Sequence, residues 1–244
     1  MKWRFIYRGL RARYRDQRQE LRALTGALGE GDVAVDVGAN KGSYLFSLSR
    51  AVPRGRVVAF EPQPLLAEYL TKACRAAGLS NVVVEAAGVS DKAGVLTLAI
   101  PGGKGTSPGA SFEQAVMSRG PCSTVEVKTL TLDQYFAEET RRIGAMKIDV
   151  EGHELPVLHG ATQILSEHSP IVVCECEARH VTKGNVATVL DFFRDHSYDG
   201  FLVCGRKLLP ASQFDPALHQ KQTGEKYWDA HDYFNNFIMQ KQRV

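Results

Sequence analysis

Residues 33–44, "VAVDVGANKGSY", place an acid and two glycines at the end of an apolar run. Gly38 and Gly42 carry no Cβ, so a ligand can approach the backbone closely there. The turn between them holds Ala39 and Asn40. The amphipathic stretch that follows would offer free N–H groups at its start. This turn is therefore a candidate ligand site, with Asp36 as its charged neighbour.

A second acid narrows the kind of ligand. Glu61, followed by Pro62, ends the next apolar run, where a carboxylate can accept hydrogen bonds from two ribose hydroxyls. The turn lacks the G-x-G-x-x-G spacing of a dinucleotide site. A carboxylate at Asp36 would repel phosphate but can anchor an ammonium group. A nucleoside with an ammonium group and no phosphate is S-adenosylmethionine, which the sequence predicts as the cofactor.

The ends of three later apolar runs supply further candidates. Ala87 and Gly88 are expected to bind the cofactor, and Asp149 and Glu175 to lie beside its methyl group, with His153 shortly after Asp149. A hydroxyl acceptor needs a base to take its proton or a cation to lower its pKa. Asp149 or His153 could be that base. Alternatively, Asp149 and Glu175 could ligate a divalent cation such as Mg²⁺, so metal dependence stays open.

Strands and helices must alternate to bring these residues together. Apolar runs predict strands at 32–37, 56–62, 81–87, 145–150, 171–177, 200–204 and 235–240. Helical periodicity predicts helices at 42–52, 64–77, 133–140, 153–167 and 185–196. This alternation favours an α/β fold with a mostly parallel sheet covered by helices on both faces, in which the last strand is antiparallel. The carboxyl ends of such strands form the ligand edge.

An insertion interrupts this alternation. Residues 95–100 and 123–131 predict a strand pair around a Gly/Pro-rich loop at 101–123. The loop is either a lid over the acceptor site or a plain surface loop.

The first 30 residues form a basic arm. Residues 1–22 hold eight Lys or Arg and two acidic residues, although the net charge of the whole chain is only +3. A stripe spaced by three and four residues predicts one long helix over 3–28: Trp3, Tyr7, Leu10, Tyr14, Gln17, Leu21, Leu24 and Leu28. The stripe is expected to cover the main domain, with a dimeric coiled coil as the alternative. The charge is consistent with a solvated face or with peripheral contact to an anionic surface or partner.

Composition indicates a soluble, cytoplasmic protein. Hydrophobic residues make up 44% of the chain, no apolar run is long enough to span a membrane, and the start has no apolar core of a secretory signal. Five cysteines without a CxxC pair favour reduced thiols over disulfides or a zinc site.

Several segments together resemble the FkbM-type S-adenosylmethionine-dependent methyltransferases: "VDVGANKGSY", "VVAFEPQP", "AAGVSDKAG", "TLDQYF", "MKIDVEGHELPVLHGA" and "PIVVCECE". The resemblance covers about residues 30–205. It implies a class I methyltransferase (Rossmann-like) fold with seven strands, the last antiparallel. It also implies methyl transfer to a hydroxyl of a sugar, glycan or secondary metabolite. We expect the methyltransferase domain to occupy residues 31–244, although residues 206–231 lie outside the resemblance.

Other functions stay open at this stage. A nucleic-acid methyltransferase could use the basic arm, but amine- and cytosine-methylating motifs are absent, so we expect no nucleic-acid partner. A non-catalytic protein that binds the cofactor or acts as a scaffold is the other alternative. A dehydrogenase would share Glu61 but lacks the glycine fingerprint. The identity of the acceptor and the oligomeric state are not readable from the sequence.

Overall fold

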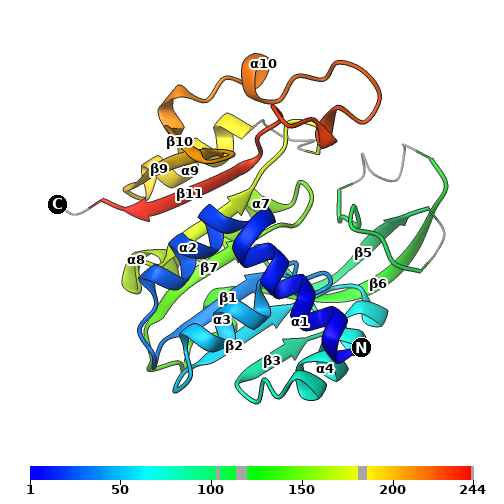
Figure 1. Ribbon diagram of the computed structural model, residues 1–244, viewed down its shortest axis with the longest axis vertical. Coiled ribbons are helices and arrows are strands. Elements are labelled where there is room, and N and C mark those ends of the chain that lie inside the picture. Colours follow the sequence, from blue (N-terminus) through cyan, green and yellow to red (C-terminus); the bar gives the residue numbers. More distant parts are fainter. Residues whose placement is uncertain (103–104, 114–119, 181–185, 243–244) are drawn as a thin grey trace.

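A mostly parallel sheet forms the centre of the protein (Figure 1). The computed structural model describes residues 1–102, 105–113, 120–180 and 186–242. The strand order is β10-β9-β11-β8-β7-β1-β2-β3. The strands are β1 (Val33–Val37), β2 (Arg56–Phe60), β3 (Val82–Glu85), β7 (Ile143–Ile148), β8 (Ile171–Glu175), β9 (Tyr198–Cys204), β10 (Lys207–Pro210) and β11 (Asn236–Lys241).

The predicted α/β fold is confirmed. The last strand, β11, runs antiparallel to both β8 and β9, as expected. Within this sheet one strand was not predicted: β10 pairs antiparallel with β9 and extends the sheet at its edge. All five residues of β1 are buried, which explains why this strand reads as a continuous apolar run with one acid.

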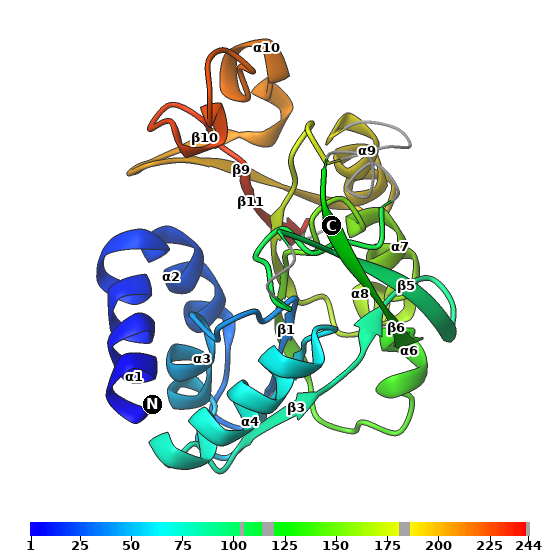
Figure 2. The same ribbon diagram turned by 90° about the vertical axis from the view of Figure 1, so that its right-hand side faces the viewer.

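Helices cover both faces of the sheet (Figure 2). On one face lie α1 (Lys2–Arg11), α2 (Arg18–Ala27), α3 (Leu45–Ala51) and α4 (Pro64–Ala77), which share one apolar cluster. On the other lie α6 (Leu132–Tyr135), α7 (Glu154–His159), α8 (Thr162–Glu167) and α9 (Val186–Asp195). Residue 185, the predicted start of the last of these helices, lies outside the described residues.

The basic arm departs from the predicted single helix. A π-helical turn (Ala12–Asp16) and a non-helical Gln17 separate α1 from α2. The extra residue of a π turn rotates the helix face, so Trp3, Tyr7 and Tyr14 are exposed, and Leu10 lies at the surface. Phe5 is fully buried in their place, whereas Leu21 and Leu24 are buried as predicted. The stripe therefore covers the sheet only in its second half.

The predicted inserted strand pair is confirmed. β5 (Gly94–Pro101) and β6 (Cys122–Leu130) are antiparallel over their whole length, and β4 (Gly88–Val89) joins them in a separate three-stranded sheet. The part of the loop at 103–104 and 114–119 lies outside the described residues.

Three predicted helices differ at their boundaries. The helix expected over 133–140 is the short α6, which already ends at Tyr135. The helix expected over 42–52 begins only at Leu45, because Gly42 has a left-handed φ of +76°. The helix expected over 153–167 is two helices that break at Gly160. A Cβ at residue 160 would lie 2.2 Å from the carbonyl oxygen of Ser90, so the chain is in close backbone contact at this break.

Candidate functional site

A pocket lies at the carboxyl ends of β1, β2 and β7. It brings together seven of the predicted site residues: Gly38, Asn40, Glu61, Pro62, Ala87, Gly88 and Asp149. Five others do not line it: Asp36, Ala39, Gly42, His153 and Glu175. The strand register explains the gathering, because Val37 is level with Phe60 of β2 and with Ile148 of β7.

The two glycines of the turn have different roles. Gly38 has φ +79°, and a Cβ built there would lie 1.8 Å from the carbonyl oxygen of Asp149. This position therefore lets β1 and the end of β7 meet at the pocket. A Cβ on Gly42 would instead lie within 3 Å of Phe5 and Leu70. Gly42 is thus a packing residue between the arm and α4.

Glu61 connects the glycine turn to the end of β2. Its carboxylate accepts hydrogen bonds from the backbone N–H groups of Asn40 (2.6 Å) and Gln63 (2.9 Å). Burial raises its pKa to about 7, although these hydrogen bonds oppose the rise. Each oxygen keeps a second lone pair, so the carboxylate can still accept from ribose hydroxyls in the adjoining pocket.

Asp36 is a buried carboxylate without a hydrogen-bond partner. It is only 1% exposed, and neither oxygen is bonded to any described residue. Burial raises its pKa to about 6, Lys147 opposes this rise, and Asp149 adds to it. A buried, unpaired carboxylate is costly. Its two acceptor oxygens therefore fit a ligand that brings an ammonium donor.

Lys147 is the one basic side chain among these acids in the part of the chain that the structure describes. It pairs in register with Asp36 across β1 and β7, and its Nζ lies 2.7 Å from Asp149 Oδ2. Its ammonium also lies over the ring of Tyr44, 5.2 Å from the centroid. Burial disfavours the charged form, but Asp149, Asp36 and Glu175 outweigh it and raise the pKa of Lys147. Lys147 therefore stays protonated and keeps positive charge beside Asp149.

A polar cluster follows the end of β8. Glu175 and Glu177 face the same side, because Asn235 Nδ2 donates to both carboxylates at 2.8 and 2.6 Å. Burial raises the pKa of Glu175 well above its usual value, and the charge of Asp149 adds to this. Burial would also raise the pKa of Glu177. The paired Arg179 outweighs this effect, so the pKa of Glu177 is lowered.

An acid–histidine pair, Glu151 and His180, lies next to this cluster on the pocket side. Glu151 has a left-handed φ of +53°, and its Oε2 lies 2.6 Å from Nδ1 of the buried His180. Glu151 also lines the pocket beside Asp149. The Glu151–His180 pair and the Lys147–Asp149 pair therefore meet at the same wall of the pocket, through Glu151 and Asp149.

The structure places His153 away from this cluster. Its Nε2 lies 2.9 Å from Ser90 Oγ, and its Nδ1 lies 3.0 Å from Glu113 Oε1. Its ring also contacts Phe112 edge-on. Both ring nitrogens are therefore engaged, in contacts that hold the insertion loop against α7.

Residues 107–112 of the insertion close over the pocket. Gln63 exchanges two hydrogen bonds with the backbone of Ser107, at 2.8 and 3.0 Å. A Cβ built on Gly88 would lie only 2.5 Å from the ring of Phe112, so the ring packs directly against this glycine. The pocket is partly open to solvent, and its free space is about 40 Å³, enough for only a few water molecules. A nucleoside-sized ligand therefore requires this segment to move.

A divalent-cation site is not assembled here. Within the described residues, no three His, Cys, Asp or Glu side chains converge as metal ligands. The predicted pair, Asp149 and Glu175, has the ammonium of Lys147 at Asp149 instead. We therefore derive no step through a metal ion.

Sequence reasoning missed Lys147, Tyr44, Arg179, His180 and Asn235. For Lys147 a signal existed: a lysine inside the apolar run "AMKIDV" lies two residues before Asp149, on the same face of the strand. Arg179 and His180 come one residue after "CECE", at a strand end. Nothing local marks Asn235, which reaches the site only because β11 lies beside β8.

Comparison with known proteins supplies further findings. The profile of the methyltransferase FkbM domain matches residues 36–199. The methyltransferase sdnD of Sordaria araneosa is 32% identical over 164 residues, which are 57% of this chain and 62% of that protein. The hexuronic acid methyltransferase AglP of Haloferax volcanii is 32% identical over 167 residues, 66% of this chain and 64% of that protein. The chain thus spans less than two thirds of these curated relatives.

Solved structures agree on the fold. A methyltransferase FkbM from Methylobacillus flagellatus matches with a TM-score of 0.55 and 17% identity, over 88% of this chain and 45% of that chain. A Streptococcus mutans protein solved with SAH matches with a TM-score of 0.53 and 12% identity, over 93% of this chain and 98% of that one. These likenesses support the Rossmann-like class I fold.

None of the described helices combines the length and the apolar character that crossing a bilayer requires.

Proposed function

This chain belongs to the FkbM methyltransferase family, and from that premise we propose that it is an S-adenosylmethionine-dependent O-methyltransferase. The observation that carries the proposal is the pocket at the ends of β1, β2 and β7, with the unpaired Asp36 carboxylate buried behind it. The cofactor, when bound, supplies an electrophilic methyl group on a sulfonium.

We assign each end of the cofactor to residues of this chain. Asp36 would accept hydrogen bonds from the α-ammonium group, and Glu61 would accept them from the ribose hydroxyls. Gly38 and Asn40 would present backbone to the ligand, while Ala87 and Gly88 would line the purine side once Phe112 has moved away. Closure of residues 107–112 would then exclude water from the site.

Asp149 is the proposed general base. Its side chain is about a quarter exposed, while its partner Lys147 is almost fully buried. It is therefore the carboxylate that an acceptor hydroxyl can reach. Asp149 would take the hydroxyl proton while the acceptor oxygen receives the methyl group, with the thioether of the demethylated cofactor as the leaving group. Lys147 would hold the Asp149 carboxylate in place through the 2.7 Å contact.

Glu175 and the Glu151–His180 pair would position the acceptor. Carboxylates and a histidine offer hydrogen bonds to several hydroxyl groups at once, which suits a sugar. The relative AglP is named a hexuronic acid methyltransferase. We propose that the acceptor of this chain is likewise a hydroxyl group, carried by a sugar or a secondary metabolite.

Calorimetry with S-adenosylhomocysteine tests the proposal first. We expect binding by the wild type, weaker binding by Asp36→Asn, and methyl transfer to members of a panel of uronic acids, glycosides and hydroxylated metabolites. Binding of NAD in preference to S-adenosylhomocysteine would overturn the proposal.

A further inference from the structure

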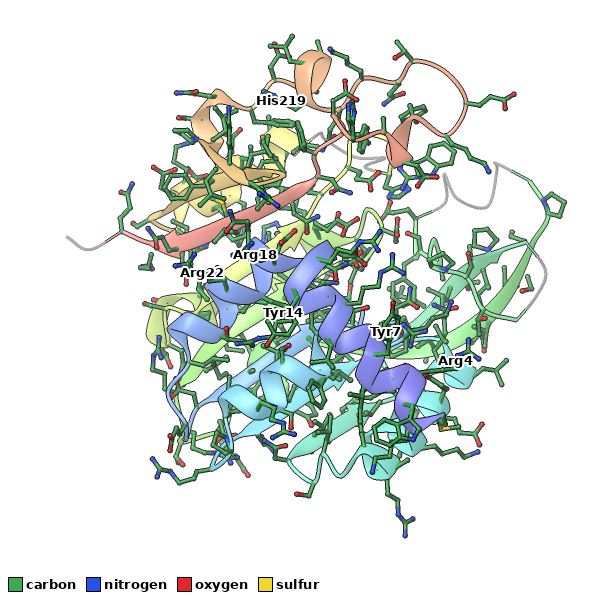
Figure 3. All side chains as sticks on the ribbon, in the orientation of Figure 1. Arg4, Tyr7, Tyr14, Arg18, Arg22 and His219 are labelled. Atoms are coloured by element: carbon green, nitrogen blue, oxygen red, sulfur yellow. The ribbon has the colours of Figure 1, made fainter. Side chains whose placement is uncertain are left out.

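A second cavity lies beside the proposed acceptor edge. It is a groove of about 650 Å³ between the basic arm and the C-terminal segment. Arg15, Arg18 and Arg22 line it from the arm, and Arg206 and Asn235 from the opposite side. Arg18 and Arg22 lie on α2 where the arm passes below β11 (Figure 3). The side chain of Gln19 bonds the carbonyl of Arg206 at 2.9 Å, so both walls are joined at this point.

The groove carries excess positive charge. Of the two acids that line it, Asp16 is already paired with Arg11 and Arg15. The other, Glu20, is buried, and burial raises its pKa. Among the described residues, Arg18, Arg22 and Arg206 form no ion pair. Three guanidinium groups thus face the groove without a carboxylate partner in the described structure.

Asn235 links the inner end of the groove to the proposed active site. It lines the groove and also donates to Glu175 and Glu177. A molecule lying in the groove would therefore have one end at the carboxylate cluster and the other among arginines.

We propose that this groove binds the anionic group of the acceptor, so that the substrate is a hydroxylated molecule carrying a carboxylate or a phosphate. Guanidinium groups match both oxyanions through paired N–H donors. The acids of the active site would hold the hydroxyl end, while the arginines hold the anionic end and set which hydroxyl meets Asp149. This inference rests on the proposed function and adds the charge of the substrate to it.

Binding of simple anions tests the groove directly. Glucuronate and inorganic pyrophosphate serve as probes, methyl glucoside as the uncharged control, and affinities are measured by calorimetry at low and physiological salt. We expect Arg18→Gln/Arg22→Gln to weaken binding of the preferred anion at least tenfold. Preference for glucuronate or for pyrophosphate identifies a carboxylate or a phosphate as the anionic group.

A matched double variant controls for the general charge of the protein. Arg13 and Arg50 line a different cavity, so Arg13→Gln/Arg50→Gln removes the same charge outside the groove and is expected to change anion affinity less than twofold. Equal weakening in both variants, or no anion binding by the wild type, would overturn the inference. Binding of S-adenosylhomocysteine, measured in parallel, separates the two proposals. If S-adenosylhomocysteine does not bind while anions still bind the groove, only the proposed function is contradicted. If S-adenosylhomocysteine binds but anion binding does not depend on the groove, only this inference is contradicted.

Discussion

The ammonium of Lys147 lies 2.7 Å from a carboxylate oxygen of Asp149, and its side chain is 4% exposed against 27% for Asp149. The cation is thus held inside the sheet while its partner reaches the pocket. The exposed side of the Asp149 carboxylate is therefore open to a group that enters the pocket, while Lys147 fixes its orientation from inside the sheet.

Replacing Asp149 should separate catalysis from cofactor binding. We expect Asp149→Asn to lower kcat by about 100-fold or more, since general-base catalysis contributes on that scale. Affinity for S-adenosylhomocysteine should stay within about threefold, because Asp36 and Glu61 are proposed to hold the cofactor. Single-turnover kinetics and calorimetry measure the two quantities, with the exposed Asp195→Asn as control. A large loss of affinity with a normal rate would remove Asp149 from the role of base.

Cofactor affinity should depend on pH through Asp36. Its pKa is raised to about 6 by burial, and only the ionised form attracts an ammonium group. Affinity for S-adenosylhomocysteine is therefore expected to rise as pH increases from about 5 to 7, and Asp36→Asn should flatten this part of the profile. Lys147→Met should move the rise to higher pH, because Lys147 lowers the pKa of Asp36. The same profile in wild type and Asp36→Asn would contradict the assignment.

The same carboxyl group should make folding stability fall with rising pH. Between its ordinary pKa of 3.8 and the raised value of about 6, folded Asp36 keeps a proton that the unfolded chain releases. Its contribution is therefore present at acidic pH and declines as pH passes from about 4 to 6, by on the order of 3 kcal/mol. Urea unfolding of wild type and Asp36→Asn at a series of pH values measures it.

Gly38→Ala should be much more damaging than the same change at another left-handed glycine. Both Gly38 (φ +79°) and Gly78 (φ +74°) would acquire backbone strain worth about 1 kcal/mol. Only at Gly38 would the new Cβ meet a backbone atom, the carbonyl oxygen of Asp149 at 1.8 Å, whereas nothing lies within 4 Å at Gly78. We expect loss of cofactor affinity in Gly38→Ala alone. Equal effects on calorimetry and thermal unfolding would mean that strain, rather than close approach, explains this glycine.

Weakening the closure of residues 107–112 should speed cofactor entry. Gln63→Ala removes both hydrogen bonds to Ser107, each worth about 1 kcal/mol. We expect the association rate of S-adenosylhomocysteine in stopped-flow measurements to increase about fivefold or more. The exposed Gln163→Ala serves as control. An unchanged rate would show that this segment does not limit access to the pocket.

The arm should stabilise the domain through Phe5 and not through its exposed aromatic residues. Phe5 is fully buried against the main domain, whereas Trp3 is 77% exposed. Phe5→Ala is therefore expected to cost about 3–5 kcal/mol, and Trp3→Ala less than about 0.5 kcal/mol, in urea unfolding. A larger loss of stability in Trp3→Ala than in Phe5→Ala would instead support the apolar stripe that the sequence predicts.

The sequence alone determined the elements and the local chemistry of the strand ends. Continuous apolar runs predicted the buried parallel strands, and the residues after them, Gly38, Glu61 and Asp149, do meet in one pocket. These features depend on side-chain periodicity and on backbone conformations that only certain residues adopt. They are therefore legible over a few neighbouring positions.

Only the tertiary structure decided which distant groups share a site. A π-helical turn, invisible to a three-and-four repeat, rotated the arm and buried Phe5 instead of Trp3. Burial and register brought Lys147 between Asp36 and Asp149, and the docking of β11 brought Asn235 to Glu175 across 60 residues. Packing between segments far apart in the chain sets these distances and the local dielectric, and with them the charge of each group, so no short stretch of sequence contains them.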